Sequence, residues 1–226
     1  MLPIRDENPS HARPLVSYSL IAINIVIFIL GSSSPELMRS LITSYSFIPS
    51  ASIERPIQSS HRLIASTFLH AGWIHLLGNI LYLSIFGDNV EAAFGHVNYL
   101  IFYLFSGISA NFTHMIVSGS PGMPLDLPTV GASGAISGIL GTYLIFYPRA
   151  RIITVIFLGY LVTLRPIPAK YFLIFWFILQ LISGALGEAV GVAYWAHIRG
   201  SLTGIMIALP YRFSRRDPLG GHRFAG

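Results

Sequence analysis

The chain has 226 residues, of which 53% are hydrophobic and only 10% charged, and it contains no cysteine. A soluble domain carries roughly 25% charged residues, so this composition, with a mean hydropathy of +0.65, indicates an integral membrane protein. The lack of cysteine excludes disulfides and thiolate chemistry. The net charge of +5 comes from basic residues that lie mainly in loops beside apolar segments, as membrane orientation requires, so we expect no nucleic-acid partner.

Six apolar segments predict transmembrane helices. They run near 15–31, 72–93, 97–118, 131–147, 170–186 and 192–211, close to the roughly 17–25 residues that cross a bilayer. No small-residue cleavage site follows the first segment, so we interpret it as a retained helix and not as a signal peptide. The predicted fold is an all-α, polytopic bundle of six helices over 15–211, between polar tails at 1–14 and 212–226.

Two connections between these segments also contain apolar residues. In the long loop 32–71, the spacing of Leu37, Leu41 and Ile42 favours short amphipathic helices at the membrane interface. The segment 152–164 is apolar but only 13 residues long and is flanked by prolines. It is too short to cross a bilayer, so we interpret it as a membrane-associated or buried loop. If it did cross, the chain would have seven spans and the orientation argued next would fail.

The distribution of lysine and arginine predicts the orientation. The segments that lie inside when both termini are cytoplasmic carry ten basic residues, whereas the opposite loops carry three. Basic residues concentrate in cytoplasmic loops, so we expect both termini in the cytoplasm and membrane lipid as a partner. The short tails favour a prokaryotic inner membrane.

Polar side chains occur inside three of the predicted spans, where each is costly in lipid. His75 and Asn79 lie in the second span, Ser133 in the fourth and His197 in the sixth. These three spans would all enter from the outer side, and His75, Ser133 and His197 each lie in the first turns of their span. The three side chains are therefore predicted to lie at a similar depth, a short way below the outer surface.

Glycines predict how the serine and the histidine could meet. Gly134 and Gly138 form a helix face of small residues on the fourth span, and Gly200 and Gly204 form another on the sixth. Such faces let helix backbones approach closely in membranes. A close crossing of these spans would bring Ser133 against His197, and a hydroxyl beside an imidazole is the minimal activated nucleophile.

Donors for an oxyanion are also present. His75 and Asn79 are four residues apart and share one helix face, and the backbone N–H of Ser133 lies at a helix start. No acid is well placed to orient His197, so the chain predicts a Ser–His dyad. The alternative is that these serine, histidine and asparagine side chains only pack or bind helices together. His70 and His75 are five residues apart with no carboxylate nearby, so we expect no metal.

Four ordered motifs resemble those of the rhomboid family of intramembrane serine proteases. They are HAGWIHLLGN at 70–79, GDNVEAAFG at 87–95, GASG at 131–134 and AHIRGSLTG at 196–204. The resemblance implies cleavage of transmembrane protein substrates without cofactor or metal. It implies Ser133 as the nucleophile, His197 as the general base, and His75, Asn79 and the Ser133 amide as the oxyanion donors. It also implies a structural role for Glu91.

The sequence departs from the family pattern at two places. His61 and Arg62 stand where many members have Trp–Arg, which leaves the packing of the first outer loop open. Ser137 stands where some members have a tyrosine that stacks on the catalytic histidine, which leaves open what holds the His197 ring.

The function expected from these observations is that of a serine endopeptidase cutting transmembrane substrates near the outer side of the bilayer. One alternative is a catalytically inactive rhomboid-like protein that binds transmembrane helices. A small transporter is a third possibility, but the sequence has no internal symmetry and no paired charges near mid-membrane to favour it.

Overall fold

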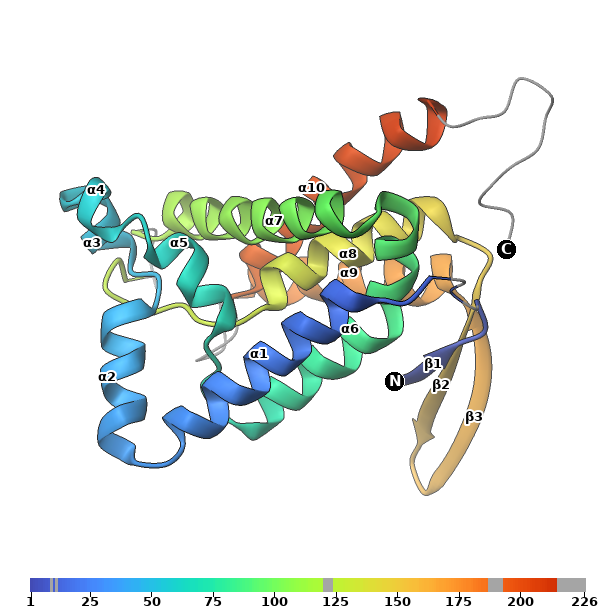
Figure 1. Cartoon of the computed structure of the whole chain (residues 1–226). Helices are drawn as coiled ribbons and strands as arrows, with labels where there is room; N and C mark the ends of the chain where they lie inside the picture. Colours follow the sequence, from blue (N-terminus) through green and yellow to red (C-terminus); the bar gives the residue numbers. More distant parts are fainter. Residues whose placement is uncertain (9, 11, 120–123, 187–192, 215–226) are drawn as a thin grey trace.

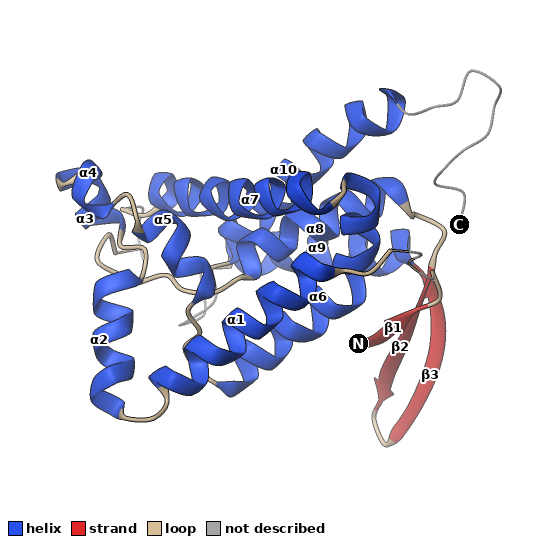
Figure 2. Ribbon diagram, in the orientation of Figure 1, coloured by secondary structure: helices blue, strands red, loops and turns tan. Residues whose placement is uncertain are grey.

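Figure 1 shows the computed structural model of the chain, which describes residues 1–8, 10, 12–119, 124–186 and 193–214. The long helices are α1 (Leu15–Gly31), α6 (Trp73–Phe94), α7 (His96–Val117), α8 (Ser133–Phe146), α9 (Ala169–Ala185) and α10 (Tyr194–Ser214). The shorter ones are α2 (Pro35–Tyr45), α3 (Pro49–Glu54), α4 (Pro56–Ser59), α5 (Arg62–Ala65) and the 3₁₀ helix η1 (Ser66–Phe68). Strands β1 (Leu2–Asp6), β2 (Arg151–Leu158) and β3 (Leu161–Pro168) form one sheet at an end of the bundle (Figure 2).

The six long helices coincide with the six apolar segments predicted from the sequence, with ends that differ by three residues or fewer. Among the described helices, only α7 is both long enough and apolar enough to cross a membrane. The stretch from α4 to η1 and helix α6 pass the same test together, with a bend of 78° between them, so the number rises to two if this bent pair is one span. Helices α1, α8 and α9 are apolar but shorter. The helices are therefore confirmed as helices, while their number of membrane crossings remains a prediction.

Helix α8 lies inside the bundle, against α6, α7, α9 and α10 (Figure 1). Its residues 134–143 are all buried. A Cβ atom on Gly204 would overlap the carbonyl of Gly138, and one on Gly141 would overlap the carbonyl of Ser201. The backbones of α8 and α10 thus touch along the glycine faces, as the sequence predicted, because only glycine allows this approach.

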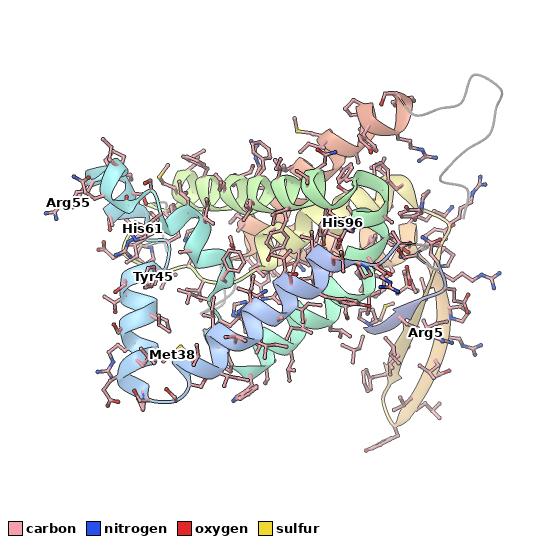
Figure 3. The ribbon with its side chains drawn as sticks, in the orientation of Figure 1. Arg5, Met38, Tyr45, Arg55, His61 and His96 are labelled. Carbon is pink, nitrogen blue, oxygen red and sulfur yellow. The ribbon has the colours of Figure 1, made fainter. Side chains whose placement is uncertain are left out.

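The loop between α1 and α6 contains the short helices that the sequence predicted. The Ser34 hydroxyl caps α2 by accepting a hydrogen bond from the Leu37 amide at 3.0 Å. At the other end of α2, Arg62 donates to the Ser46 carbonyl at 3.0 Å, and the rings of Tyr45 and His61 lie 6.0 Å apart (Figure 3). The His61–Arg62 pair therefore holds α5 against the end of α2, which answers how this loop packs.

The sheet is a correction to the all-α prediction, because the protein is mostly helical but not entirely so. The apolar segment 152–164 is a β-hairpin and not a loop, and residues 2–6 are a strand and not part of a polar tail. β1 pairs antiparallel with β2, Leu2 opposite Val155 and Asp6 opposite Ile152. The run IITVI at 152–156 is rich in β-branched residues, which favour strands. Most of the predicted C-terminal tail, 215–226, lies outside the described residues.

Glu91, near the end of α6, caps the start of α1. Its buried carboxylate accepts hydrogen bonds from the amides of Val16 and Ser17 at 2.8 Å and from the Ser17 hydroxyl at 2.7 Å, and His96 Nδ1 lies 2.6 Å away. A carboxylate at a helix N-terminus satisfies amides that have no partner in their own helix and interacts favourably with the helix dipole. The structural role expected for Glu91 thus has a definite form: it connects α1 to α6.

Replacing Glu91 with alanine is expected to lower the free energy of unfolding by about 3 kcal/mol, because it leaves buried donors without a partner. Denaturant unfolding in detergent micelles measures this. Glu54→Ala, which removes an exposed carboxylate of α3, should change stability by no more than about 0.5 kcal/mol. Equal stability of the Glu91 and Glu54 variants would contradict the capping role.

Candidate active site

The structure brings Ser133 and His197 together. Ser133 is the first residue of α8, and His197 lies in the first turn of α10. Nε2 of His197 is 2.8 Å from the Ser133 hydroxyl oxygen, within hydrogen-bond range. This geometry lets the imidazole take the hydroxyl proton, which is the arrangement of an activated nucleophile.

Backbone packing between α8 and α10 fixes this distance. Gly200 lies one turn after His197, and a Cβ atom at this position would overlap the carbonyl oxygen of Gly134, the residue after Ser133. The small residues at Gly134 and Gly200 are therefore the local reason that the two side chains can reach each other.

The segment that leads into Ser133 is held by backbone hydrogen bonds to the loop between α1 and α6. Phe47 and Thr129 exchange amide–carbonyl bonds at 3.0 and 2.8 Å, and the Gly131 amide donates to the Ser66 carbonyl at 2.9 Å. Gly131 has a φ of +125°, which a residue with a side chain rarely adopts. The turn therefore places Ser133 at the start of α8, where its own N–H has no partner within the helix.

His75 and Asn79 reach the same place from α6. A Cβ atom built on Gly131 would lie 2.6 Å from Nε2 of His75 and 3.7 Å from Nδ2 of Asn79. Nδ2 of Asn79 is buried and has no hydrogen-bond partner within the part of the chain that the structure describes. Two side-chain donors on one helix face, as the spacing predicted, thus converge two residues before Ser133.

A residue that the sequence reasoning missed, Gln180 of α9, holds the histidine ring. Nδ1 of His197 lies 2.9 Å from Oε1 of Gln180, whose Nε2 donates to the Trp176 carbonyl at 3.4 Å. The Trp176 ring also lies 6.0 Å from the His197 ring at an interplanar angle of 30°. Because Oε1 accepts from Nδ1–H, Nε2 is left free to accept the serine proton. Gln180 is a polar residue inside a predicted span, so the criterion that identified the other site residues would have marked it as a candidate, although not its contact with His197.

No acidic residue takes this place within the part of the chain that the structure describes. Asp126 accepts a hydrogen bond from the Ser50 hydroxyl, Glu91 caps α1, and Glu188 lies outside the described residues. The site is thus a Ser–His pair with an amide, not a carboxylate, on the second imidazole nitrogen.

A cavity of 890 Å³ opens onto these groups. Its lining is mostly apolar with a few convergent polar side chains, as is usual for substrate sites. Five of the long helices contribute to the lining, with Trp73, Tyr82, His114, Leu140 and Trp176 among its residues beside Ser133, His197, His75 and Asn79. The cavity is large enough to admit several residues of an extended peptide beside Ser133.

Comparison with known proteins shows the family of the chain. The family model for the Rhomboid domain matches residues 58–213. A stretch of 156 residues is 30% identical to rhomboid-like protein 11, chloroplastic, of Arabidopsis thaliana, and covers 65% of this chain and 51% of that protein. A second stretch, of 204 residues, is 27% identical to rhomboid protein 1, mitochondrial, of Saccharomyces cerevisiae, and covers 87% of this chain and 53% of that protein.

A shorter stretch of 83 residues is 41% identical to YdcA of Bacillus subtilis, named as a candidate rhomboid protease, and covers 37% of this chain and 39% of that protein. The chain spans about half the length of the first two relatives. The family match includes α6 to α9, all of α10 except its last residue, and the side chains of Ser133, His197, His75, Asn79 and Gln180. The chain therefore belongs to the rhomboid family, whose members are integral membrane proteins.

Proposed function

We propose that this protein is an intramembrane serine endopeptidase that cleaves transmembrane protein substrates with Ser133 as nucleophile and His197 as general base. The observation that carries the proposal is the 2.8 Å contact between His197 Nε2 and the Ser133 hydroxyl, beside a large cavity. The relative named as a candidate rhomboid protease supports the same activity.

The reaction follows from the positions of the two side chains. The Ser133 oxygen attacks the scissile carbonyl carbon while Nε2 of His197 takes the hydroxyl proton. The imidazolium then returns this proton to the leaving amine as the C–N bond breaks, which leaves an acyl-enzyme. Nε2 next takes a proton from water, which attacks the ester and releases the acid, and the imidazolium reprotonates Ser133.

The negative charge on the carbonyl oxygen is assigned to three donors. They are the Ser133 amide at the start of α8, and the His75 side chain and Nδ2 of Asn79, which both lie beside Gly131. Losing one donor of this kind typically costs about 10²–10³ in rate.

The placement of the site favours cleavage of a substrate helix near one of its ends. Ser133, His197 and His75 each lie in the first turn of their helix, so the site is near one end of the bundle. If both termini are cytoplasmic, this is the outer end. A helical peptide bond is already hydrogen-bonded and protected, so the substrate must unwind locally before the serine can attack.

A fluorophosphonate probe tests the proposal without knowledge of the natural substrate. The purified protein in detergent should be labelled covalently at Ser133, and labelling should be lost in Ser133→Ala and His197→Ala. Circular dichroism of each variant controls for folding. Absence of labelling in the folded wild-type protein would contradict the protease assignment and favour an inactive relative that binds transmembrane helices.

Gln180 is expected to act as a positioning residue. Gln180→Leu keeps the volume but removes the acceptor, so kcat should fall about 10- to 100-fold, equivalent to about 1.4–2.7 kcal/mol of barrier, with KM nearly unchanged. Gln180→Glu keeps an acceptor at Nδ1 and should retain most of the activity. Steady-state kinetics on a reconstituted substrate measure both. Equal losses in the Leu and Glu variants would show that Gln180 serves only packing.

A further inference from the structure

The end of the β2–β3 hairpin projects beyond the rest of the protein. Residues 156–163, which we call the distal hairpin, lie past the point where Leu2 of β1 pairs with Val155. The segment 152–164 contains no charged residue. Four large side chains of the distal hairpin are strongly exposed, namely Phe157 (60%), Tyr160 (106%), Leu161 (70%) and Val162 (64%).

The exposed apolar side chains lie on both faces of the hairpin. Phe157 pairs with Val162 across the two strands, so these two side chains share one face. Leu161 is adjacent to Val162 along β3 and therefore lies on the opposite face. Docking of a protein usually covers one face of a hairpin, whereas immersion in lipid covers both. The two-sided pattern therefore favours lipid.

Basic side chains surround the base of the hairpin. Arg5, Arg149, Arg151 and Arg165 are exposed there, and Lys170 follows at the start of α9, so basic residues outnumber the exposed Glu7, whose amide donates to the Arg151 carbonyl. Arg5 is seen beside the sheet in Figure 3. Each basic residue near a membrane surface is attracted to anionic headgroups by roughly 1 kcal/mol. A hairpin with an apolar tip and basic side chains at its base thus matches the apolar and headgroup layers at the surface of a bilayer.

The direction of the hairpin also favours contact with lipid. It leaves the bundle at the end where α1 begins and runs across the direction of α7, to the side of the helices (Figure 1). In an integral membrane protein, a hairpin that extends sideways from one end of the bundle lies within the interfacial layer of the bilayer, where lipid contacts both of its faces, and does not extend into the aqueous phase.

We propose that the distal hairpin is a lipid anchor, in which Phe157, Tyr160, Leu161 and Val162 enter the leaflet nearest the sheet and the basic side chains at the base bind anionic phospholipid headgroups. The insertion is shallow. Beyond Val155, no further strand among the described residues lies beside the outer edge of either strand, and unpaired backbone groups are not tolerated in the hydrocarbon core. The tip therefore ends at the boundary between headgroups and acyl chains.

The absence of native cysteine allows a direct test. Tyr160→Cys carries a bimane label in proteoliposomes that contain phosphatidylglycerol, and Ser214→Cys, at the exposed polar end of α10, is the matched control. We expect iodide to quench the label at 160 about threefold less than the label at 214. Lipids brominated near the headgroup should quench the label at 160 strongly, and lipids brominated near the end of the acyl chain should not.

Each other outcome overturns the proposal. Equal iodide quenching at both positions, without quenching by brominated lipid, would show that the tip lies in water. Protection from iodide without quenching by brominated lipid, together with cross-linking through residue 160, would show that a second copy covers it. Strong quenching by bromine near the end of the acyl chain would contradict the shallow depth. None of these readouts depends on proteolytic activity.

Discussion

His197→Ala is expected to reduce the rate of peptide-bond cleavage by at least about 10⁴-fold, because it removes the only group placed to take the Ser133 proton among the described residues. Without this base the hydroxyl stays protonated near neutral pH and is a weak nucleophile. The measurement is the initial rate on a substrate with a single transmembrane helix, reconstituted with the purified enzyme in liposomes.

The controls for this prediction use the coupling between the two residues. Ser133→Ala should lose a similar factor, and the double variant should be no worse than either single one, since both remove the same step. His61→Ala, which changes a histidine of the loop between α1 and α6, should leave the rate nearly unchanged. A His197→Ala enzyme within about tenfold of wild type would contradict the general-base role.

Gly200→Ala is expected to reduce activity by about 10²-fold or more, although the residue touches no reacting atom. The added methyl would overlap the Gly134 carbonyl, and α10 can accommodate it only by moving away from α8 beside Ser133. A displacement of about 1 Å in a catalytic pair is enough for a loss of this size. Fluorophosphonate labelling rate and cleavage rate should fall together.

Gly184→Ala is the matched control for this steric argument. A Cβ atom on Gly184 would lie 3.4 Å from its nearest neighbours, an ordinary contact, so activity should be nearly unaffected. Thermal unfolding of both variants separates misalignment from loss of the fold. A folded Gly200→Ala protein with wild-type activity would show that the contact between α8 and α10 does not position the dyad.

The amino-acid sequence by itself determined the features that depend on local pattern. The six long helices follow from apolar runs that a bilayer or a core requires, and their ends agree with the structure within three residues. The pairing of Ser133 with His197 follows from two glycine faces and from polar residues where lipid makes them costly. The approach of His75 and Asn79 to the same place follows from their four-residue spacing.

Only the tertiary structure decided the contacts that depend on which segments meet and which way a helix is turned. Helix α9 is apolar around most of its surface, so its sequence has no clear periodicity to show that Gln180 faces His197. Glu91 and Ser17 are 74 residues apart, and no local signal pairs them. The strand at Leu2–Asp6 exists because β2 offers it an edge about 150 residues later in the chain. Pairing between distant segments is selected by the packing of the whole fold, and local propensity does not contain that information.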